Sequence, residues 1–368
     1  MTLVFTVVIV LHGLIHLMGP AKAFGVADLP QLTQPVATGM GLLWLAAALL
    51  MLSSGAAIWL VPRWWWLLGL TAVVVSQAAI GGAWTDARAG TIPNIIVLAG
   101  VVFGYLAWGP SSLRAQYDVD VNRGLSRITE PSVVREAHLA HLPGPVADYV
   151  RASGAVGQPR VRSMRVRMHG RIRAGASDAW MPFLAEQYNF YDQPSRFFYM
   201  NASKMLVPIQ GYHRFVDREA SMLVKIAASL PVARAAGDEM TRAETVTLFN
   251  DMCLLAPSTL MDPAIGWESI DTRAVRATFT QAGHTIRADL RFNDRAELVD
   301  FTSDDRRQAS ADGRTLRSVR WSTPFGEYRQ FGQYRLGSHG EARWHEAGSS
   351  YAYIEITIDD ISFNVAAR

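Results

Sequence analysis

Apolar residues are concentrated in four long stretches within the first third of the chain. These stretches cover residues 2–18, 37–61, 64–83 and 91–108, and only five charged side chains occur before residue 114. A helix needs roughly 20 residues to cross the hydrocarbon core of a bilayer, with about 17 to 25 as the usual range. The pattern therefore predicts four membrane-spanning helices.

The first stretch could also be a cleaved signal peptide, because Ala21-Lys22-Ala23 imitates a cleavage site. A signal peptide begins with a basic segment, and no lysine or arginine precedes Lys22. We therefore interpret this stretch as a span. The tryptophans near the ends of the four stretches, including Trp64, Trp65 and Trp66 after Arg63, are typical of the membrane interface.

Beyond residue 160 the apolar pattern changes to a period of two. Within residues 161–173, apolar positions alternate with the basic residues Arg165, Arg167, His169, Arg171 and Arg173. Alternation of this kind is typical of half-buried strands. It recurs near residues 180–191, 196–203, 209–217, 267–281, 284–293, 296–303, 316–336 and 341–363.

A few helical segments interrupt the strand pattern. Residues 133–142 and 146–154 predict two short helices. A third is predicted over 245–256, opened by a capping box from Thr241 to Glu244. Residues 221–230 fit a helix or a strand equally well.

These patterns together predict the fold class. We expect an α-helical four-span membrane domain, followed by an α+β domain with a large curved antiparallel meander and one or two helices. The predicted boundaries are 1–110 for the membrane domain, 111–130 for a polar linker and 131–368 for the soluble β-rich domain.

Composition excludes some functions. The 35 basic residues outnumber the 32 acidic ones only slightly, so the isoelectric point of about 9.1 does not indicate nucleic-acid binding. The only cysteine, Cys253, cannot form a disulfide within one chain, and its apolar surroundings indicate a core position.

Basic residues near the ends of the spans predict the orientation. Four lie on the side of the soluble domain and two on the opposite side: Arg63, Arg114, Arg123 and Arg127 against Lys22 and Arg88. Because basic residues accumulate on the cytoplasmic side, this distribution favours a multi-pass protein of a bacterial inner or plasma membrane with a cytoplasmic soluble domain.

Several segments spread along the chain resemble an uncharacterised bacterial family, known only as a domain of unknown function, whose members often carry a helical membrane anchor. The segments are HGLIHLMGPAKAFG (12–25), SQAAIGGAWTDARAGTIPN (76–94), GQPRVRSMRVRMHGRIR (157–173), MPFLAEQYNF (181–190) and GEYRQFGQYRLGSHGEARW (326–344). The resemblance brings no known activity. The curved meander also distantly resembles the half-barrels of lipoprotein carriers, which implies a lipid-binding fold in the periplasm. A periplasmic location conflicts with the distribution of basic residues near the span ends. We favour the cytoplasmic location that this distribution indicates.

Two histidines four residues apart stand in the first apolar stretch and share one helix face. With four spans, the end of the first span and the loop before the fourth lie on the same side of the membrane. The polar residues predicted at this membrane face are His12, His16, Lys22, Asp86, Arg88 and Asn94. One interpretation is a metal or haem site, although no glutamate lies between the histidines to act as a base. The others are a structural or proton-handling polar cluster, and plain helix packing with a solvated loop.

Two candidate sites lie in the strands. Glu186, Tyr188 and His213 could line a ligand pocket. The basic residues Arg165, Arg167, Arg171 and Arg173 could bind lipid headgroups, but we favour a charged strand face that prevents edge-to-edge pairing.

No nucleophile motif, phosphate-binding loop or zinc-ligand spacing is visible, so the sequence indicates no cofactor and leans against an enzyme. We predict a membrane-anchored protein that binds a hydrophobic or amphiphilic ligand such as a lipid in its β-rich domain, with membrane lipid as partner and no nucleic acid. Two alternatives stay open: an enzyme with a polar or metal site near His12 and His16, and a structural partner of other membrane proteins.

Overall fold

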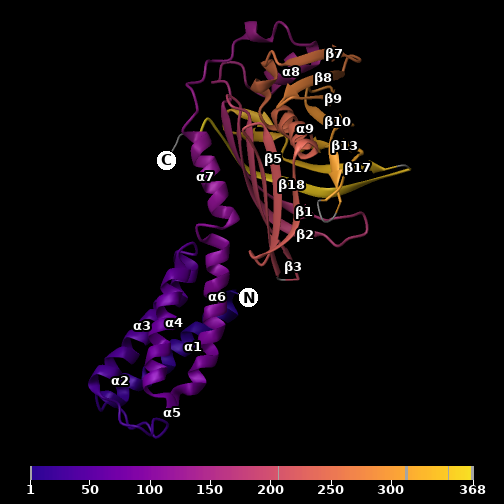
Figure 1. The fold of residues 1–368 in the computed structure, drawn as a ribbon. Coiled ribbons are helices and arrows are strands. Elements are labelled where there is room, and N and C mark those ends of the chain that lie inside the picture. The colour runs from indigo at the N-terminus through magenta and orange to yellow at the C-terminus, as the bar shows by residue number, and fades with distance from the viewer. Residues whose placement is uncertain (1, 206, 311–313, 347, 366–368) are drawn as a thin grey trace. The chain divides into compact units, whose positions relative to one another are not determined.

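A computed structural model describes residues 2–205, 207–310, 314–346 and 348–365. The chain divides into two compact units, Met1–Ala115 and Gln116–Arg368 (Figure 1). The first unit is helical, and the second is built around one large antiparallel sheet. The predicted fold class is therefore confirmed, whereas the exact domain boundaries stay a prediction.

The first unit contains the four apolar segments expected from the sequence. Its helices are α1 (Thr2–Ile15), α2 (Met18–Ala23), α3 (Thr38–Leu60), α4 (Trp65–Gly82), α5 (Trp84–Ala87), the 3-10 turn η1 (Arg88–Gly90) and α6 (Thr91–Trp108). Four helical segments are long and apolar enough to cross a membrane: Thr2–Ala23, Thr38–Leu60, Trp65–Gly82 and Trp84–Leu125. The last of these runs from α5 through α7 (Leu113–Leu125), a helix that forms within the predicted polar linker.

Small residues let these helices approach one another closely. A Cβ atom on Gly19 would lie only 2.4 Å from the ring of Trp44, and one on Gly55 would lie 3.2 Å from Val10. Helices in lipid associate through such close van der Waals packing, since lipid tails are as apolar as the side chains.

The second unit contains a 14-stranded sheet among the described residues. Its strands are β1 (Ser163–Ile172), β2 (Met181–Phe190), β3 (Ser195–Lys204), β4 (Val207–Val216), β5 (Glu219–Ile226), β6 (Leu230–Ala236), β7 (Ile265–Ser269), β8 (Ala274–Gln281), β9 (His284–Phe292), β10 (Leu298–Ser303), β13 (Arg320–Ser322), β14 (Phe325–Gly326), β17 (His339–Glu346) and β18 (Ser349–Phe363). The strand order is β6-β5-β4-β3-β2-β1-β18-β17-β13-β10-β9-β8-β7, with β14 paired to β17. The short hairpins β11 (Arg307–Ala309) with β12 (Leu316–Ser318) and β15 (Arg329–Phe331) with β16 (Tyr334–Leu336) lie outside this sheet.

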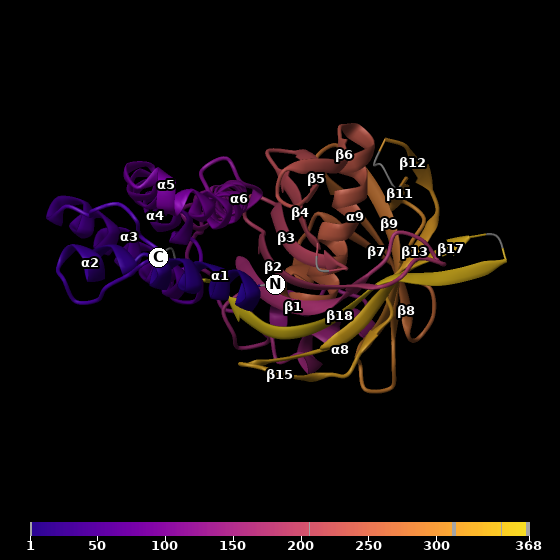
Figure 2. The same ribbon diagram turned by 90° about the horizontal axis from the view of Figure 1, so that it is seen from below.

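Helix α9 (Asp238–Leu255) covers the concave face of the sheet. Figure 2 shows it inside the curve, where it packs against β5 and β6 of one arm and β9 and β10 of the other. The 3-10 turn η3 (Pro257–Met261) follows it, and helix α8 (Gly144–Ala152) packs on η3 and β8. Since α9 rests mainly on the two arms, the central strands face it across a gap that side chains only partly fill.

The end of α7 that belongs to the second unit packs on the convex face. Tyr117 lies among Tyr188, Tyr199 and Tyr212, with ring centroids 5.6 to 6.4 Å apart. The Asp120 carboxylate accepts hydrogen bonds from the Tyr212 hydroxyl and from Arg214 Nε, both at 2.8 Å.

Several local predictions need correction. The helix predicted over 133–142 is wrong, because only a 3-10 turn forms at Glu136–Leu139; isolated helices this short are marginal in water. The uncertain segment 221–230 is mainly strand β5. The strand predicted over 316–336 is split into several short strands around Pro324 and Gly332, because proline cannot donate to a strand ladder and glycine weakens a strand.

Candidate functional site

The two histidines of the first unit form a buried polar cluster with residues from α4 and α6. His12 Nε2 lies 2.9 Å from Asn94 Oδ1 and 3.1 Å from Ser76 Oγ, and His16 Nε2 lies 2.7 Å from the same Ser76 Oγ. The side chain of Trp44 packs edge-on against His16. Hydrogen bonds of this kind connect helices inside an apolar bundle, where an unpaired polar group is costly.

The other members of the predicted membrane-face cluster lie apart from the histidines. Lys22 Nζ donates to the carbonyl oxygen of Leu32, and Asp86 accepts hydrogen bonds from Thr33 and Gln34. Arg88 lies in η1 and is exposed. The structure thus brings together only His12, His16 and Asn94 of the six predicted residues. Within the described ranges, no group of three histidine, cysteine, aspartate or glutamate side chains could hold a metal ion.

Carboxylates from neighbouring strands pair with most of the basic face of β1. The ion pairs are Arg165 with Glu186 at 2.5 Å, Arg167 with Asp360 at 3.5 Å and Arg171 with Glu355 at 2.6 Å. Arg173 instead donates to the carbonyl oxygens of Ala352 and Ala176, and its guanidinium lies over Trp180. Headgroup binding by these arginines stays a prediction, and it would compete with these pairs.

Strand register separates the three residues predicted to line a ligand pocket. Side chains alternate between the two faces of a sheet, so Glu186 and Tyr188 of β2 share one face, and Gln187 points to the other. Gln187 pairs with Phe198 of β3, which pairs with His213 of β4. His213 therefore lies on the concave face with Gln187, whereas Glu186 and Tyr188 lie on the convex face.

The concave face holds the candidate site. A cavity of about 190 Å³ lies between α9 and the central strands. Most of its walls are apolar, and the aliphatic and thioether side chains that line it come from β1, β3, β17, β18 and α9: Met168, Ile172, Met200, Ala342, Ile354, Ile356, Ile358, Leu254 and Leu255.

One part of the cavity is lined by a buried ionic network centred on Arg196. Its guanidinium donates to Asp251 at 2.7 Å, to Glu244 at 3.1 Å and to the side-chain oxygen of Gln187 at 3.0 Å. The Asp251 carboxylate also accepts hydrogen bonds from Gln187 and Asn189. Arg196 is 7% exposed and Glu244 is 1% exposed, so these charges depend on one another rather than on water.

The network also shifts the protonation of Glu244. Burial by itself raises the pKa of this carboxyl group, but attraction to Arg196 and the hydrogen bond with His213 more than offset that effect and lower the pKa to about 2. Glu244 therefore remains ionised near neutral pH. His213 Nδ1 lies 3.4 Å from Glu244 Oε1, and its side chain is 24% exposed.

Arg196, Glu244 and Asp251 were not predicted as site residues from the sequence. The sequence pattern predicted Glu244 to be a capping residue of a helix that starts after Thr241. Helix α9 instead begins one turn earlier, at Asp238, and Thr241 Oγ1 donates to the carbonyl oxygen of Gly237. A usable signal was present: Glu244 and Asp251 are seven residues apart in an apolar helix, so both carboxylates lie on one face.

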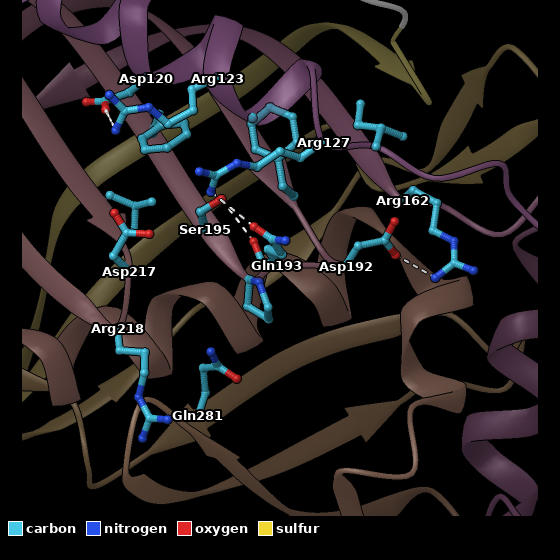
Figure 3. Close-up of a pocket in the computed structure, with 16 residues that line it drawn as sticks. Asp120, Arg123, Arg127, Arg162, Asp192, Gln193, Ser195, Asp217, Arg218 and Gln281 are labelled. Atoms are coloured by element: carbon cyan, nitrogen blue, oxygen red, sulfur yellow. Dashed lines mark hydrogen bonds and ion pairs between the residues drawn. The ribbon is translucent and has the colours of Figure 1, made fainter.

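A second cavity, of about 150 Å³, lies near the end of α7 and the β2–β3 and β4–β5 turns (Figure 3). Its rim is polar: Arg162 and Asp192 form an ion pair at 2.5 Å, and Arg127 donates to the side chain of Gln193 at 3.0 Å. The cavity under α9 is the better candidate because its lining is more largely apolar.

Comparisons with known proteins place these features in context. No curated protein matches the chain in sequence. The solved structures that are similar to this chain include the following two. A domain from Vibrio parahaemolyticus described as an outer membrane lipoprotein-sorting protein is 9% identical, with 55% of this chain and 85% of that chain covered and a TM-score of 0.33. A protein of the DUF1329 family from Desulfovibrio piger is 12% identical, with 64% and 95% covered and a TM-score of 0.36.

A family model matches residues 132–356, which include the cavity-lining strands β1–β4, helix α9 and the whole Arg196 network. This match covers more than half of the chain. The chain therefore belongs to a family of unknown function, DUF6544.

Proposed function

We propose that the β-rich unit binds an apolar or amphiphilic small molecule, such as a lipid, in the cavity beneath α9. The observation that carries the proposal is the composition of this cavity, which has apolar walls and a few convergent polar groups on one part of its lining. Sites for small molecules usually combine an apolar lining with a small number of placed polar groups.

The size of the cavity fits this proposal. An apolar cavity of about 150 Å³ engineered into another protein is large enough to take up benzene. The cavity beneath α9, at about 190 Å³, exceeds that volume.

Filling the cavity with a larger side chain tests the proposal. Ala342 of β17 is buried and lines the cavity. We expect Ala342→Phe in the full-length protein to abolish co-purification of apolar ligands, because the phenyl ring takes their place. Native mass spectrometry of protein released from detergent measures the bound mass.

The matched control is Ala236→Phe, since Ala236 is exposed at the end of β6 and outside the cavity. This variant should retain the ligand of the wild type. A wild-type protein without any bound apolar molecule, or equal ligand content in all three proteins, would contradict the proposal.

We further propose that the four apolar helices cross the membrane and that the β-rich unit is cytoplasmic. The four basic residues near the span ends on its side, against two on the other, support this orientation. A green fluorescent protein fused after Arg368 should fluoresce, and alkaline phosphatase at the same position should be inactive. The reverse pair of results would place the β-rich unit outside the cytoplasm.

A further inference from the structure

Arg306 is a buried cation of the cavity with an incomplete set of partners. Its side chain is 12% exposed, and its Nη1 donates to the carbonyl oxygen of Arg307 at 3.0 Å. Its Nη2 lies 3.8 Å from Glu244 Oε1, which is too long for a hydrogen bond. Its Nε has no hydrogen-bond partner among the described residues. An arginine carries five N–H donors, so several of them are open to an acceptor.

Arg196 explains why Arg306 has no hydrogen bond with a buried carboxylate. Arg196 takes the strong hydrogen bonds of both buried carboxylates, at 2.7 Å from Asp251 and 3.1 Å from Glu244. A largely buried guanidinium that keeps unpaired N–H donors is costly. A ligand that supplies the missing acceptor would therefore bind preferentially beside Arg306.

A second open donor lies close to Arg306. The guanidinium of Arg306 lies 5.6 Å from the ring centre of Trp321, whose Nε1 donates to the Tyr353 hydroxyl at 3.2 Å. Tyr353 accepts that hydrogen bond, and its own hydroxyl hydrogen has no acceptor within the described part of the chain. All three side chains line the cavity. The guanidinium of Arg306 and the hydroxyl of Tyr353 both belong to the cavity lining, so both can donate to one head group.

The rest of the cavity lining indicates the chemistry of the remaining part of the ligand. The wall formed by β1 and β18 is aliphatic, and it includes Ile172, Ile354 and Ile356. An apolar tail would contact this wall.

We propose that the ligand is a carboxylate amphiphile, such as a fatty acid, whose head group binds to Arg306 and Tyr353 and whose tail lies along β1 and β18. This inference rests on the proposed function, and it adds the chemical class of the head group. Arginine is well suited to it, because its planar fork of donors matches a carboxylate.

Decanoate and 1-decanol, which share a ten-carbon chain, test the head group. Binding of each radiolabelled probe to the full-length protein in nanodiscs is counted as the excess over the Ala342→Phe variant in the same nanodiscs. We expect wild type to bind decanoate at least tenfold more tightly than 1-decanol. Arg306→Gln should lose at least tenfold in affinity for decanoate and less than twofold for 1-decanol. Arg276→Gln, in an exposed ion pair with Asp289, should bind both probes like wild type.

Tyr353→Phe provides a second variant, because it removes only a hydroxyl from a buried ring. It should weaken decanoate binding severalfold even if Arg306→Gln fails to fold. If 1-decanol binds wild type as tightly as decanoate, or if neither variant changes decanoate binding, the head-group proposal is overturned and the proposed function stands. If neither probe binds above the Ala342→Phe background, both proposals fail.

Discussion

Replacing Arg196 by methionine is expected to lower the free energy of unfolding of the full-length protein by about 3–5 kcal/mol. The substitution keeps most of the side-chain volume but leaves the carboxylates of Glu244 and Asp251 without their shared cation. Both carboxylates are buried, so water cannot replace the lost partner. Breaking a buried ion pair on one side is much more damaging than removing both partners, since an unpaired charge remains in the interior.

Urea unfolding in detergent micelles, followed by circular dichroism of the sheet, measures this effect as a shift of the midpoint. The matched control is Arg276→Met, which breaks the ion pair with Asp289. Both of these side chains are well exposed, at 45% and 39%, so the expected loss is below about 1 kcal/mol. Equal losses in the two variants would show that the network around Arg196 is not an essential part of the core.

Acidification from about pH 4.5 to about pH 2 is expected to remove roughly 3 kcal/mol of stability through Glu244 alone. The pKa of this carboxyl group is about 2 in the folded protein against an ordinary value of 4.5, because attraction to Arg196 and the bond with His213 outweigh the effect of burial. The contribution is fully present above pH 4.5. It is lost as the pH falls towards 2, since the unfolded chain then binds a proton that the folded protein does not.

Unfolding free energies at several pH values between 2 and 5 measure this dependence. In Glu244→Gln the slope should fall by about 1.4 kcal/mol per pH unit near pH 3, which corresponds to one proton. Glu268→Gln, an exposed residue of β7, is the control and should keep the slope of wild type. A slope in Glu244→Gln equal to that of wild type would mean that other carboxylates govern acid unfolding.

The candidate site shows where sequence patterns lose information. Alternation along β2 correctly indicated a strand, but it did not tell which face would be concave. Glu186 and Tyr188 were chosen as pocket residues, whereas their neighbour Gln187 lines the cavity. A shift of one residue moves a side chain to the other face of a sheet, so the decision depends on which side α9 covers.

Local motifs failed for a related reason. The spacing of Thr241 and Glu244 fits a capping box, and nothing nearby in the sequence contradicts it. The partner that Glu244 actually has, Arg196, lies 48 residues earlier in the chain. The histidine cluster was anticipated better, because His12 and His16 share a helix face. Ser76 was still missed, since its part in the cluster depends on how α4 rotates against α1.

The two-part architecture, the four apolar helices and the antiparallel meander could be predicted from the amino-acid order alone, because hydrophobic length and periodicity are local properties of each segment. The candidate site of the β-rich unit depends instead on tertiary packing. The apolar cavity forms because the sheet is curved and α9 packs on its two arms. The same packing places Arg196, Glu244, Asp251 and Arg306 in the cavity lining. Contacts between residues so distant in sequence depend on how whole elements pack, and no local pattern encodes that packing.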